Sequence, residues 1–464
     1  MDECMTLALP PRLCVSGFEG VSYLFHAKLT IAMRSYSCLF FLLFFLAACA
    51  PRLSLPQQQQ YVDLLARRDY FALRDEMDRA GRRLSGQQRQ YYQAYLENAF
   101  NQPAASIRTA NRLLTRTARL SPETVSNLLI LQIDNYAKTF AYAQAHEVSQ
   151  LLLTRYAPVL DSSYRASIAN SDLIWAALAG QEAQRIFFEG ESRIPWKRDK
   201  MGLMTVPLRS GLAQWDFVFD TGANFSTISE TNARKMDLKL LNAEFDVGSS
   251  TGMKLRSRIG IAEAFRIGNM LIQHAVFLVL PDEQLAFPQY NYAIPGIIGF
   301  PVIEQMREVR IHKNGTLTVP AQPQDRGLRN LALHELMPMV RLASDRDTLV
   351  YHLDTGARQT AFFSPYYEKY RAELEQQGAP DTVRVGGAGG MAALPVYNVK
   401  KLTLYIGDQQ AQLSDVKVQT QRMEHTGDLF YGHIGQDVIR QFDEMILNFV
   451  QMYLDFRQGI SGED

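Results

Sequence analysis

Two short segments of the chain place an aspartate directly after an apolar run. Asp220 follows Phe217-Val218-Phe219, and Asp354 follows an apolar run that ends in Leu353. Each aspartate begins the sequence Asp-Thr-Gly-Ala, and the two copies lie 134 residues apart. Two carboxyl groups about 3 Å apart cannot both ionise, so such a pair would share one proton. One group could then act as a general base toward water while the other acts as a general acid.

The three residues after each aspartate are suited to a tight turn around its carboxylate. Glycine has no side chain, so the turn lets backbone N–H groups approach the carboxylate. The same residue types follow both aspartates: Thr221, Gly222, Ala223, Thr355, Gly356 and Ala357. A single Asp-Thr-Gly sequence can also be a plain Asx-type turn after a strand. Two copies in matching contexts favour a pair of related loops.

Further sequence features recur in the same order after each aspartate. Glycine clusters at residues 248–252 and 386–390 begin 28 and 32 residues after the respective aspartate. An isoleucine-glycine-polar turn follows at offsets of 48 and 53 residues. An apolar-glycine element then ends at Gly299 and Gly435, at offsets of 79 and 81 residues. Landmarks in the same order at nearly equal offsets indicate an internal duplication.

This order of landmarks resembles one lobe of the retropepsins and pepsins, which are aspartic peptidases. The segment Ile-Pro-Gly-Ile-Ile-Gly-Phe at residues 294–300 is especially similar to the element that closes such a lobe. The resemblance covers residues 200–456. It implies two β lobes in one chain, with Asp220 and Asp354 as catalytic residues that activate water to hydrolyse a peptide bond. It also implies a protein or peptide substrate and no cofactor.

The resemblance assigns roles to the residues around the two aspartates. The hydroxyl groups of Thr221 and Thr355 would interlock the two loops and hold the carboxyl pair coplanar. The glycine clusters would be flap hairpins that bind an extended peptide, with ends at Gly248, Gly252, Gly386 and Gly390. Neither flap segment carries the tyrosine familiar from pepsins, and alanine follows each Asp-Thr-Gly as in retropepsins. Alanine removes a hydroxyl donor to the ionised pair, which predicts an activity optimum at roughly pH 5–6.5.

Upstream of the duplication the sequence predicts helices. From residue 58 to residue 188, apolar residues such as Tyr61 and Leu65 recur at helical spacing on a charged background. Helix-start signals stand at Ser121-Pro122-Glu123 and Asp161-Ser162-Ser163. Helix pairs of this length resemble degenerate tetratricopeptide repeats. Such a domain would either be a packing spacer or bind a protein partner.

After Pro195, short β-rich runs broken by glycine and polar turns replace the helical pattern. We therefore predict an α+β multidomain protein. An N-terminal all-α helical-hairpin domain would precede an all-β bilobal acid-protease domain, a double retropepsin-like barrel. The predicted boundaries are residues 50–190 for the helical domain, 195–325 for the first lobe and 326–464 for the second. Residues 1–49 would form a signal-peptide region.

The four cysteines all lie in that leading region, at Cys4, Cys14, Cys38 and Cys49. The body of the protein therefore has no disulfide framework and no cysteine-based zinc site. An apolar run at residues 39–48 is too short to span a bilayer as a helix. It fits the core of a signal peptide that starts at Met33.

This run ends in Leu-Ala-Ala-Cys, which resembles the lipobox of bacterial lipoproteins with Cys49 as the lipidated residue. The resemblance implies a lipid anchor in the cell envelope and a protein that faces the periplasm. The outer membrane is favoured, because Ala50 stands where many proteins retained at the inner membrane have aspartate. The alternative is a cytosolic protein with few thiols, in which the run is a buried helix and the cysteine is incidental.

Charge and histidine spacing exclude other classes of function. A net charge of +0 gives no basic field to attract nucleic acid. Five histidines lack metal-ligand spacing, so we predict no metal site; they are His274, His312, His334, His352 and His425.

The sequence thus predicts an aspartic endopeptidase of the cell envelope. The alternative is a lipid-anchored helical scaffold or binding protein with an inactive peptidase-like domain. Intact Asp, Thr and Gly in both copies favour the peptidase. Pairing of aspartates between two copies of the chain is a third arrangement, which the internal duplication makes unnecessary.

Overall fold

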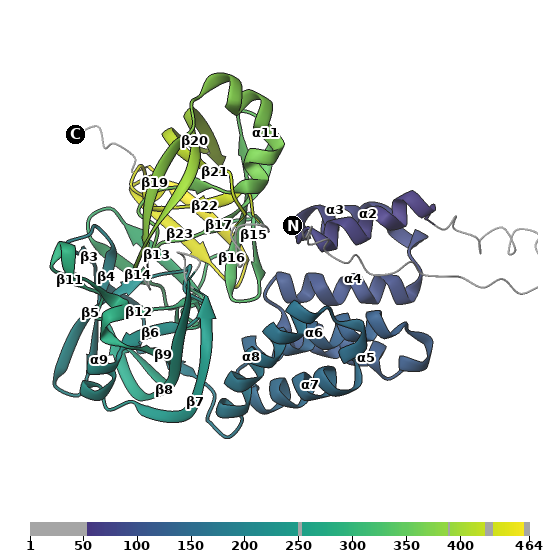
Figure 1. Ribbon diagram of the computed structural model, residues 1–464, viewed down its shortest axis with the longest axis horizontal. Helices are drawn as coiled ribbons and strands as arrows, with labels where there is room; N and C mark the ends of the chain where they lie inside the picture. Colours follow the sequence, from purple (N-terminus) through teal and green to yellow (C-terminus); the bar gives the residue numbers. More distant parts are fainter. Residues whose placement is uncertain (1–52, 249–252, 388–389, 423–429, 459–464) are drawn as a thin grey trace, which may run out of the picture.

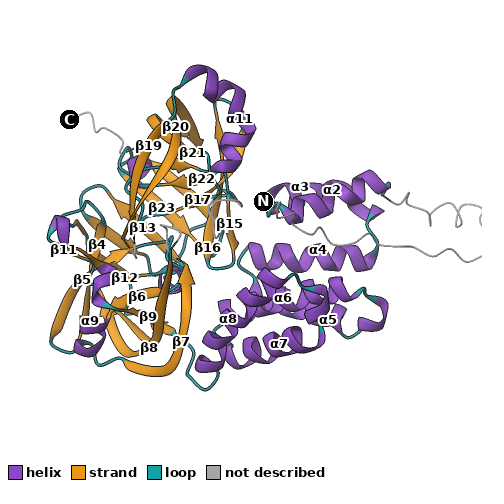
Figure 2. Ribbon diagram, in the orientation of Figure 1, coloured by secondary structure: helices purple, strands orange, loops and turns teal. Residues whose placement is uncertain are grey.

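The computed structural model describes residues 53–248, 253–387, 390–422 and 430–458. In these ranges the chain has the predicted α+β fold, with helices first and β-rich lobes after them (Figures 1 and 2). Two predicted site residues, Cys49 and Gly252, lie outside the described residues. No helix in the described ranges is long and apolar enough to cross a lipid bilayer.

The N-terminal domain is a series of helices, each packed against the next. Polar side chains begin several of them by accepting a hydrogen bond from a backbone N–H of the first turn. Ser121 Oγ accepts from Thr124 at 3.2 Å, and Asp161 Oδ1 accepts from Tyr164 at 2.8 Å. Both are predicted helix starts, which are confirmed. The helices are α2 Leu55–Ala66, α3 Tyr70–Ala80, α4 Gly86–Ala99, α5 Pro103–Leu114, α6 Pro122–Lys138, α7 Tyr142–Arg155 and α8 Ser162–Leu178.

The helices end earlier than predicted. α8 stops at Leu178, and Arg185–Phe187 is already strand β1, where the sequence pattern predicts helix up to residue 188. β1 pairs with strand β9 through Arg185↔Gln273 and Phe187↔Leu271, so it belongs to the first β sheet. Gly180 follows the helix end and favours its termination.

The first lobe, called lobe 1 here, is a nine-stranded sheet with the order β1-β9-β6-β12-β5-β4-β8-β7, and β3 pairs with β4. β8 also pairs with β9, so the sheet curls onto itself. Its strands are β1, β3 Lys197–Arg198, β4 Met204–Ser210, β5 Ala213–Phe219, β6 Ser226–Ser229, β7 Lys239–Gly248, β8 Lys254–Ile267, β9 Met270–Leu280 and β12 Gly296–Ile298. Lobe 1 also contains the β10 Ala286–Phe287 and β11 Tyr292–Ala293 pair, and helices α9 Glu230–Lys235 and α10 Phe300–Gln305.

The second lobe, lobe 2, repeats this plan in an eight-stranded sheet ordered β15-β16-β17-β22-β18-β21-β20-β19. β16 also pairs with β20, which curls this sheet as well. Its strands are β15 Leu331–His334, β16 Met337–Ser344, β17 Thr348–Leu353, β18 Ala361–Phe362, β19 Asp381–Gly387, β20 Gly390–Ile406, β21 Gln409–Gln419 and β22 Gly432–Ile434. Its helices are α11 Ser364–Gln377 and α12 Gln436–Ile439.

A third sheet joins the lobes. It has the order β2-β14-β13-β23-β24, in which β13 of the first half pairs antiparallel with β23 of the second. Its strands are β2 Ser192–Pro195, β13 Glu308–His312, β14 Thr316–Val319, β23 Glu444–Asn448 and β24 Tyr453–Arg457. The rings of Phe300 and Phe449 meet edge to face across this junction, with centroids 5.5 Å apart. The apolar core is therefore continuous between the lobes.

The helical domain packs against both lobes (Figure 1). Near its start, Tyr70 and Leu96 share an apolar cluster with Met337 and Met339 of lobe 2. Near its end, Tyr142 and other residues of α7 and α8 share a cluster with lobe 1 strands β7, β8 and β9. The domain therefore bridges the two lobes along one side.

Candidate active site

Asp220 and Asp354 occupy equivalent places at the ends of strands β5 and β17. The Asp220 N–H donates to the carbonyl of Ile298 at 3.1 Å, in the parallel neighbour β12. The Asp354 N–H donates to the carbonyl of Ile434 at 3.0 Å, in the parallel neighbour β22. The apolar-glycine elements of the repeat thus form the strands that anchor each aspartate loop.

The two loops are interlocked through their threonines. Thr221 Oγ1 donates to the carbonyl of Leu353 at 2.7 Å and accepts from the Thr355 N–H at 3.1 Å. Thr355 Oγ1 donates to the carbonyl of Phe219 at 2.8 Å and accepts from the Thr221 N–H at 3.0 Å. Both threonines are fully buried. Four buried hydrogen bonds therefore fix the position of one loop relative to the other.

This interlock brings the carboxyl groups together. A Cβ placed on Gly222 would lie 2.8 Å from Cγ of Asp354, and one on Gly356 would lie 2.4 Å from Cγ of Asp220. Each glycine therefore lies against the carboxyl group of the opposite lobe, where a larger residue would collide with it. Each carboxylate also accepts from the glycine of its own loop: Gly222 N–H to Asp220 Oδ1 at 2.8 Å, and Gly356 N–H to Asp354 Oδ1 at 2.9 Å.

The electrostatics of the pair favour a bound proton. The pKa of the Asp220 carboxyl is well above its ordinary value, first because burial penalises the charged form. The negative charge of Asp354 adds to this rise, and a side-chain hydrogen bond links the two groups. Backbone N–H groups of Gly222 and Gly356 oppose it in part by stabilising the ionised form. A carboxylic acid next to a second carboxyl group, joined by a hydrogen bond, is the arrangement in which two groups share one proton.

The alanines after the two glycines differ in their contacts. The Ala357 N–H donates to Asp354 Oδ1 at 2.9 Å, whereas the Ala223 N–H points to the backbone carbonyl of Asp220 at 3.4 Å. Neither side chain carries a donor. The surroundings of the two carboxylates are therefore similar but not identical.

Two supporting residues escaped the sequence prediction. The Gly299 N–H donates to Ser226 Oγ at 3.1 Å, and the Gly435 N–H donates to Thr360 Oγ1 at 3.0 Å. Ser226 and Thr360 each lie six residues after the aspartate of their lobe, so the repeat offsets contained the signal. A Cβ on Gly299 would lie 2.4 Å from the backbone carbon of Phe225, so this contact requires glycine. Hydroxyl and glycine together fasten the closing strand to the aspartate loop.

Lobe 2 adds a contact that lobe 1 lacks. Gln436 is buried beside the interlock and donates from Nε2 to the carbonyl of Thr355 at 2.8 Å. Its Oε1 accepts from Arg198 of lobe 1. The equivalent residue in lobe 1 is Phe300, so repeat symmetry gives no hint of this link.

His352 precedes Asp354 by two residues on β17 and is buried against the ring of Phe430, with centroids 5.8 Å apart. Burial lowers the pKa of His352 to about 4, so the side chain is neutral near pH 7. It therefore places no positive charge beside the aspartate pair. Among the described residues, no group of three or more His, Cys, Asp or Glu side chains is placed to hold a metal ion.

The predicted flap glycines lie at the ends of two hairpins. Gly248 ends β7 of the β7–β8 hairpin in lobe 1, while Gly386 and Gly390 flank the turn of the β19–β20 hairpin in lobe 2. A Cβ on Gly386 would lie 3.9 Å from the ring of Phe287, so the lobe 2 hairpin reaches toward lobe 1. Phe287 belongs to an apolar cluster with Leu255 of β8 and Val218, two residues before Asp220. Strands of both hairpins therefore extend to the neighbourhood of the aspartates.

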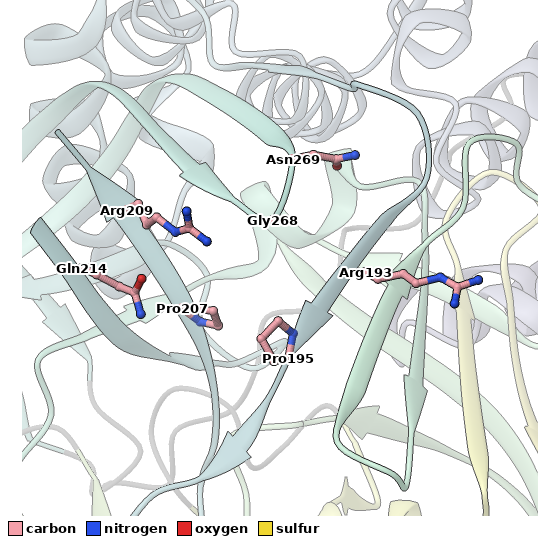
Figure 3. A pocket seen from close by; sticks show the side chains of 7 residues that line it. All are labelled: Arg193, Pro195, Pro207, Arg209, Gln214, Gly268 and Asn269. Atoms are coloured by element: carbon pink, nitrogen blue, oxygen red, sulfur yellow. The ribbon is translucent and has the colours of Figure 1, made fainter. Parts of the chain in front are cut away.

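A surface pocket of about 330 Å³ lies elsewhere on lobe 1 and its junction with the third sheet (Figure 3). Gln214 on its wall stands at the start of β5, six residues before Asp220 at the other end, which corresponds to ~20 Å of strand. None of its lining residues is a predicted site residue. These are Arg193, Pro195, Pro207, Arg209, Gln214, Gly268 and Asn269.

Comparison with known protein families supports the predicted resemblance of lobe 1 to an aspartic peptidase lobe. Residues 206–302 match the family model described as aspartyl protease. The matched segment begins in β4 and ends in α10, so it contains the Asp220 loop, the β7–β8 hairpin and Gly299. A search of curated protein sequences returned no match. The match to the aspartyl protease family model thus falls within lobe 1, and lobe 2 repeats the topology of lobe 1 around Asp354.

Proposed function

We propose that the protein is an aspartic endopeptidase, with Asp220 and Asp354 as its catalytic residues. The observation that carries the proposal is the contact between two partly buried carboxyl groups supplied by interlocked loops of two similar lobes. The family match to lobe 1 supports the same reaction class. A plain pair of turns would not require four buried hydrogen bonds that cross between the lobes.

In the proposed reaction the singly protonated pair binds one water molecule. The ionised carboxylate accepts a proton from the water as its oxygen attacks the carbonyl carbon of the peptide bond. The protonated carboxyl group donates its proton to the carbonyl oxygen, which gives a neutral tetrahedral diol. The newly protonated carboxyl group then donates its proton to the nitrogen while the other carboxylate accepts a proton from a diol hydroxyl. The carbon–nitrogen bond breaks, and the pair returns to its starting state. Because the pair titrates as a unit, we assign neither role to one residue.

We propose that strands β7–β8 and β19–β20 bind the substrate as an extended peptide. Extended chains pair through their main-chain groups with exposed strand edges, and alternate side chains enter pockets. Gly248, Gly386 and Gly390 are the described glycines of these hairpins, and Gly252 completes the set named from the sequence.

We further propose that the protein acts in the bacterial cell envelope, tethered through lipid on Cys49 and facing the periplasm, with the outer membrane favoured. The support is the Leu-Ala-Ala-Cys sequence after an apolar run of signal-peptide length. The helical domain would then stand between the membrane anchor and the peptidase lobes. It would bind a protein partner or act as a spacer.

The test of the function is cleavage of a mixture of peptides of varied sequence by the purified protein, across about pH 3–8. Mass spectrometry would identify the products, and a statine-type peptide with a hydroxyl group in place of the scissile carbonyl should block their formation. That hydroxyl mimics the tetrahedral diol and should bind the parent far more tightly than a substrate peptide does. A folded protein that cleaves no peptide and binds no statine peptide would refute the peptidase and favour the lipid-anchored scaffold.

A further inference from the structure

Helix α8 of the helical domain lies against the outer edge of the β7–β8 hairpin (Figure 1). β7 is the terminal strand of the lobe 1 sheet, so its outward backbone groups face no further strand of that sheet. Asn170 of α8 takes the place of that strand at Asp246. Its Nδ2 donates to the Asp246 carbonyl at 2.8 Å, and its Oδ1 accepts from the Asp246 N–H at 3.1 Å. One side-chain amide thus pairs with both outward groups of one strand residue.

Apolar packing strengthens this contact. Phe245, the neighbour of Asp246 on β7, is fully buried in a cluster with Trp175 and Ile174 of α8. Asn170 and Trp175 therefore hold adjacent residues of the same strand from the same helix. The hydrogen bonds fix the register of the strand against the helix, and the packed rings of Phe245 and Trp175 fix the distance between strand and helix.

The same helix reaches the Asp220 loop. The Trp175 ring lies 6.5 Å from the ring of Phe225, measured between centroids, and Phe225 follows Asp220 by five residues. Val247, next to Asp246, packs against both the cluster around Trp175 and the cluster around Val218. α8 therefore contacts the hairpin on one side and the segment behind the Asp220 loop on the other.

We infer that α8 is part of the active-site scaffold and that Asn170 is a positioning residue, which holds the β7–β8 hairpin in place beside the aspartates. This inference rests on the proposed peptidase activity. The lobe 1 hairpin thus takes its position from a domain outside the match to the protease family. The extended peptide would bind to a surface that the helical domain holds in place.

The variant Asn170→Ala removes both hydrogen bonds and leaves the buried rings in place. We expect the KM for a peptide substrate to rise about three- to tenfold, with kcat within about twofold of the parent. The effect should fall on KM because the hairpin contacts the substrate alike in the ground state and the transition state. Asn170→Gln keeps the amide and should bring KM back toward the parent value.

Asn101 offers a matched control in the same domain. Its Nδ2 donates to Glu304 Oε1 at 2.7 Å and to the carbonyl of Phe449 at 3.0 Å, so it too makes two hydrogen bonds to the β lobes. Neither contact involves the β7–β8 or the β19–β20 hairpin. Asn101 has φ +56°, which suits glycine, so Asn101→Gly removes the contacts without backbone strain. This variant should lower Tm and leave KM unchanged.

The experiment measures kcat, KM and Tm for the parent, Asn170→Ala, Asn170→Gln and Asn101→Gly, together with hydrogen exchange of the Asp246 amide. The expected result is that KM rises and Asp246 exchange becomes faster in Asn170→Ala and, to a lesser degree, in Asn170→Gln, while Asn101→Gly keeps the parent values. An active parent whose KM is unchanged in a folded Asn170→Ala variant would overturn the positioning role and leave the peptidase standing. Equal KM changes in Asn170→Ala and Asn101→Gly would also overturn it, because general loosening of the domain would then explain both. A parent that cleaves no peptide would overturn both proposals.

Discussion

The variant Thr221→Val removes one hydroxyl from the interlock while it keeps the shape of the side chain. The hydroxyl donates to the Leu353 carbonyl at 2.7 Å and accepts from the Thr355 N–H at 3.1 Å, both in lobe 2. Thr221 is fully buried, so water cannot replace either bond. Leaving a buried donor or acceptor without a partner costs about 1–3 kcal/mol for each group. With two such groups left without a partner, we expect the free energy of unfolding to fall by about 2–6 kcal/mol.

The reciprocal variant Thr355→Val should behave alike, because its hydroxyl makes the mirror pair of bonds to Phe219 and Thr221. Thr403→Val is the control. Thr403 is also a buried threonine, but its hydroxyl bonds to two exposed side chains, Gln412 Oε1 at 3.4 Å and the carboxylate of Asp345, which water can solvate in its place. Its loss should cost less than about 1 kcal/mol.

Urea unfolding followed by tryptophan fluorescence would measure the free energy of unfolding of all three variants. The loss of stability should be accompanied by a loss of peptide cleavage in Thr221→Val and Thr355→Val, and not in Thr403→Val. If Thr221→Val lost no more stability than Thr403→Val, the interlock would not be holding the two loops together.

Three further predictions concern the charge of the pair and the leading region. Burial and the charge of Asp354 raise the pKa of Asp220 above its ordinary 3.8, so the folded protein binds this proton more tightly than the unfolded chain does. The free energy of unfolding therefore falls as pH rises through the raised pKa. Asp220→Asn should remove this loss of stability. Urea unfolding at about pH 4.5 and 7.5 should show that the free energy of unfolding of the variant, relative to that of the parent, is higher at the higher pH; the same difference at both pH values would contradict the raised pKa. Ala223→Ser and Ala357→Thr add a hydroxyl donor that stabilises the ionised pair, so the acid limb of kcat/KM, near roughly pH 5 in the parent, should move to lower pH; an unmoved limb would show that other groups set it. Cys49→Ser should release the protein from membranes in cell fractionation or stall its processing, whereas an unmodified N-terminus upstream of Cys49 in mass spectra of the parent would exclude the lipid anchor.

Much of the β half follows from local sequence. The Asp-Thr-Gly-Ala copies and the spaced glycines correspond to structural needs: Gly222 and Gly356 lie against the opposite carboxyl groups, and Gly299 abuts the backbone of Phe225. Ser226 and Thr360 were recoverable by the same comparison of offsets. In a duplicated chain the same structural requirement recurs in both halves, so a comparison of the halves reveals the residues that meet it.

Contacts between elements that are far apart along the chain produce no recognisable pattern in the sequence. The pairing of β1 with β9 makes Arg185–Phe187 a strand through a partner far along the chain, although the local pattern continues the helices. Asn170 meets Asp246 across two domains, and each is an ordinary polar residue in its own segment. Gln436 breaks the repeat symmetry, so comparison of the halves cannot find it. Tertiary neighbours decide these positions, and only the three-dimensional structure supplies them.

The central claim is that Asp220 and Asp354 form one catalytic unit. The most direct test is the rate of peptide cleavage by Asp220→Asn, by Asp354→Asn and by the double variant, each shown to be folded by circular dichroism. The account predicts that each single variant loses at least about a thousandfold in kcat, and that the double variant loses no more than either, because residues that act as a unit are not additive. A single variant that kept cleavage within about tenfold of the parent would show that one carboxyl group suffices and would contradict the shared-proton mechanism.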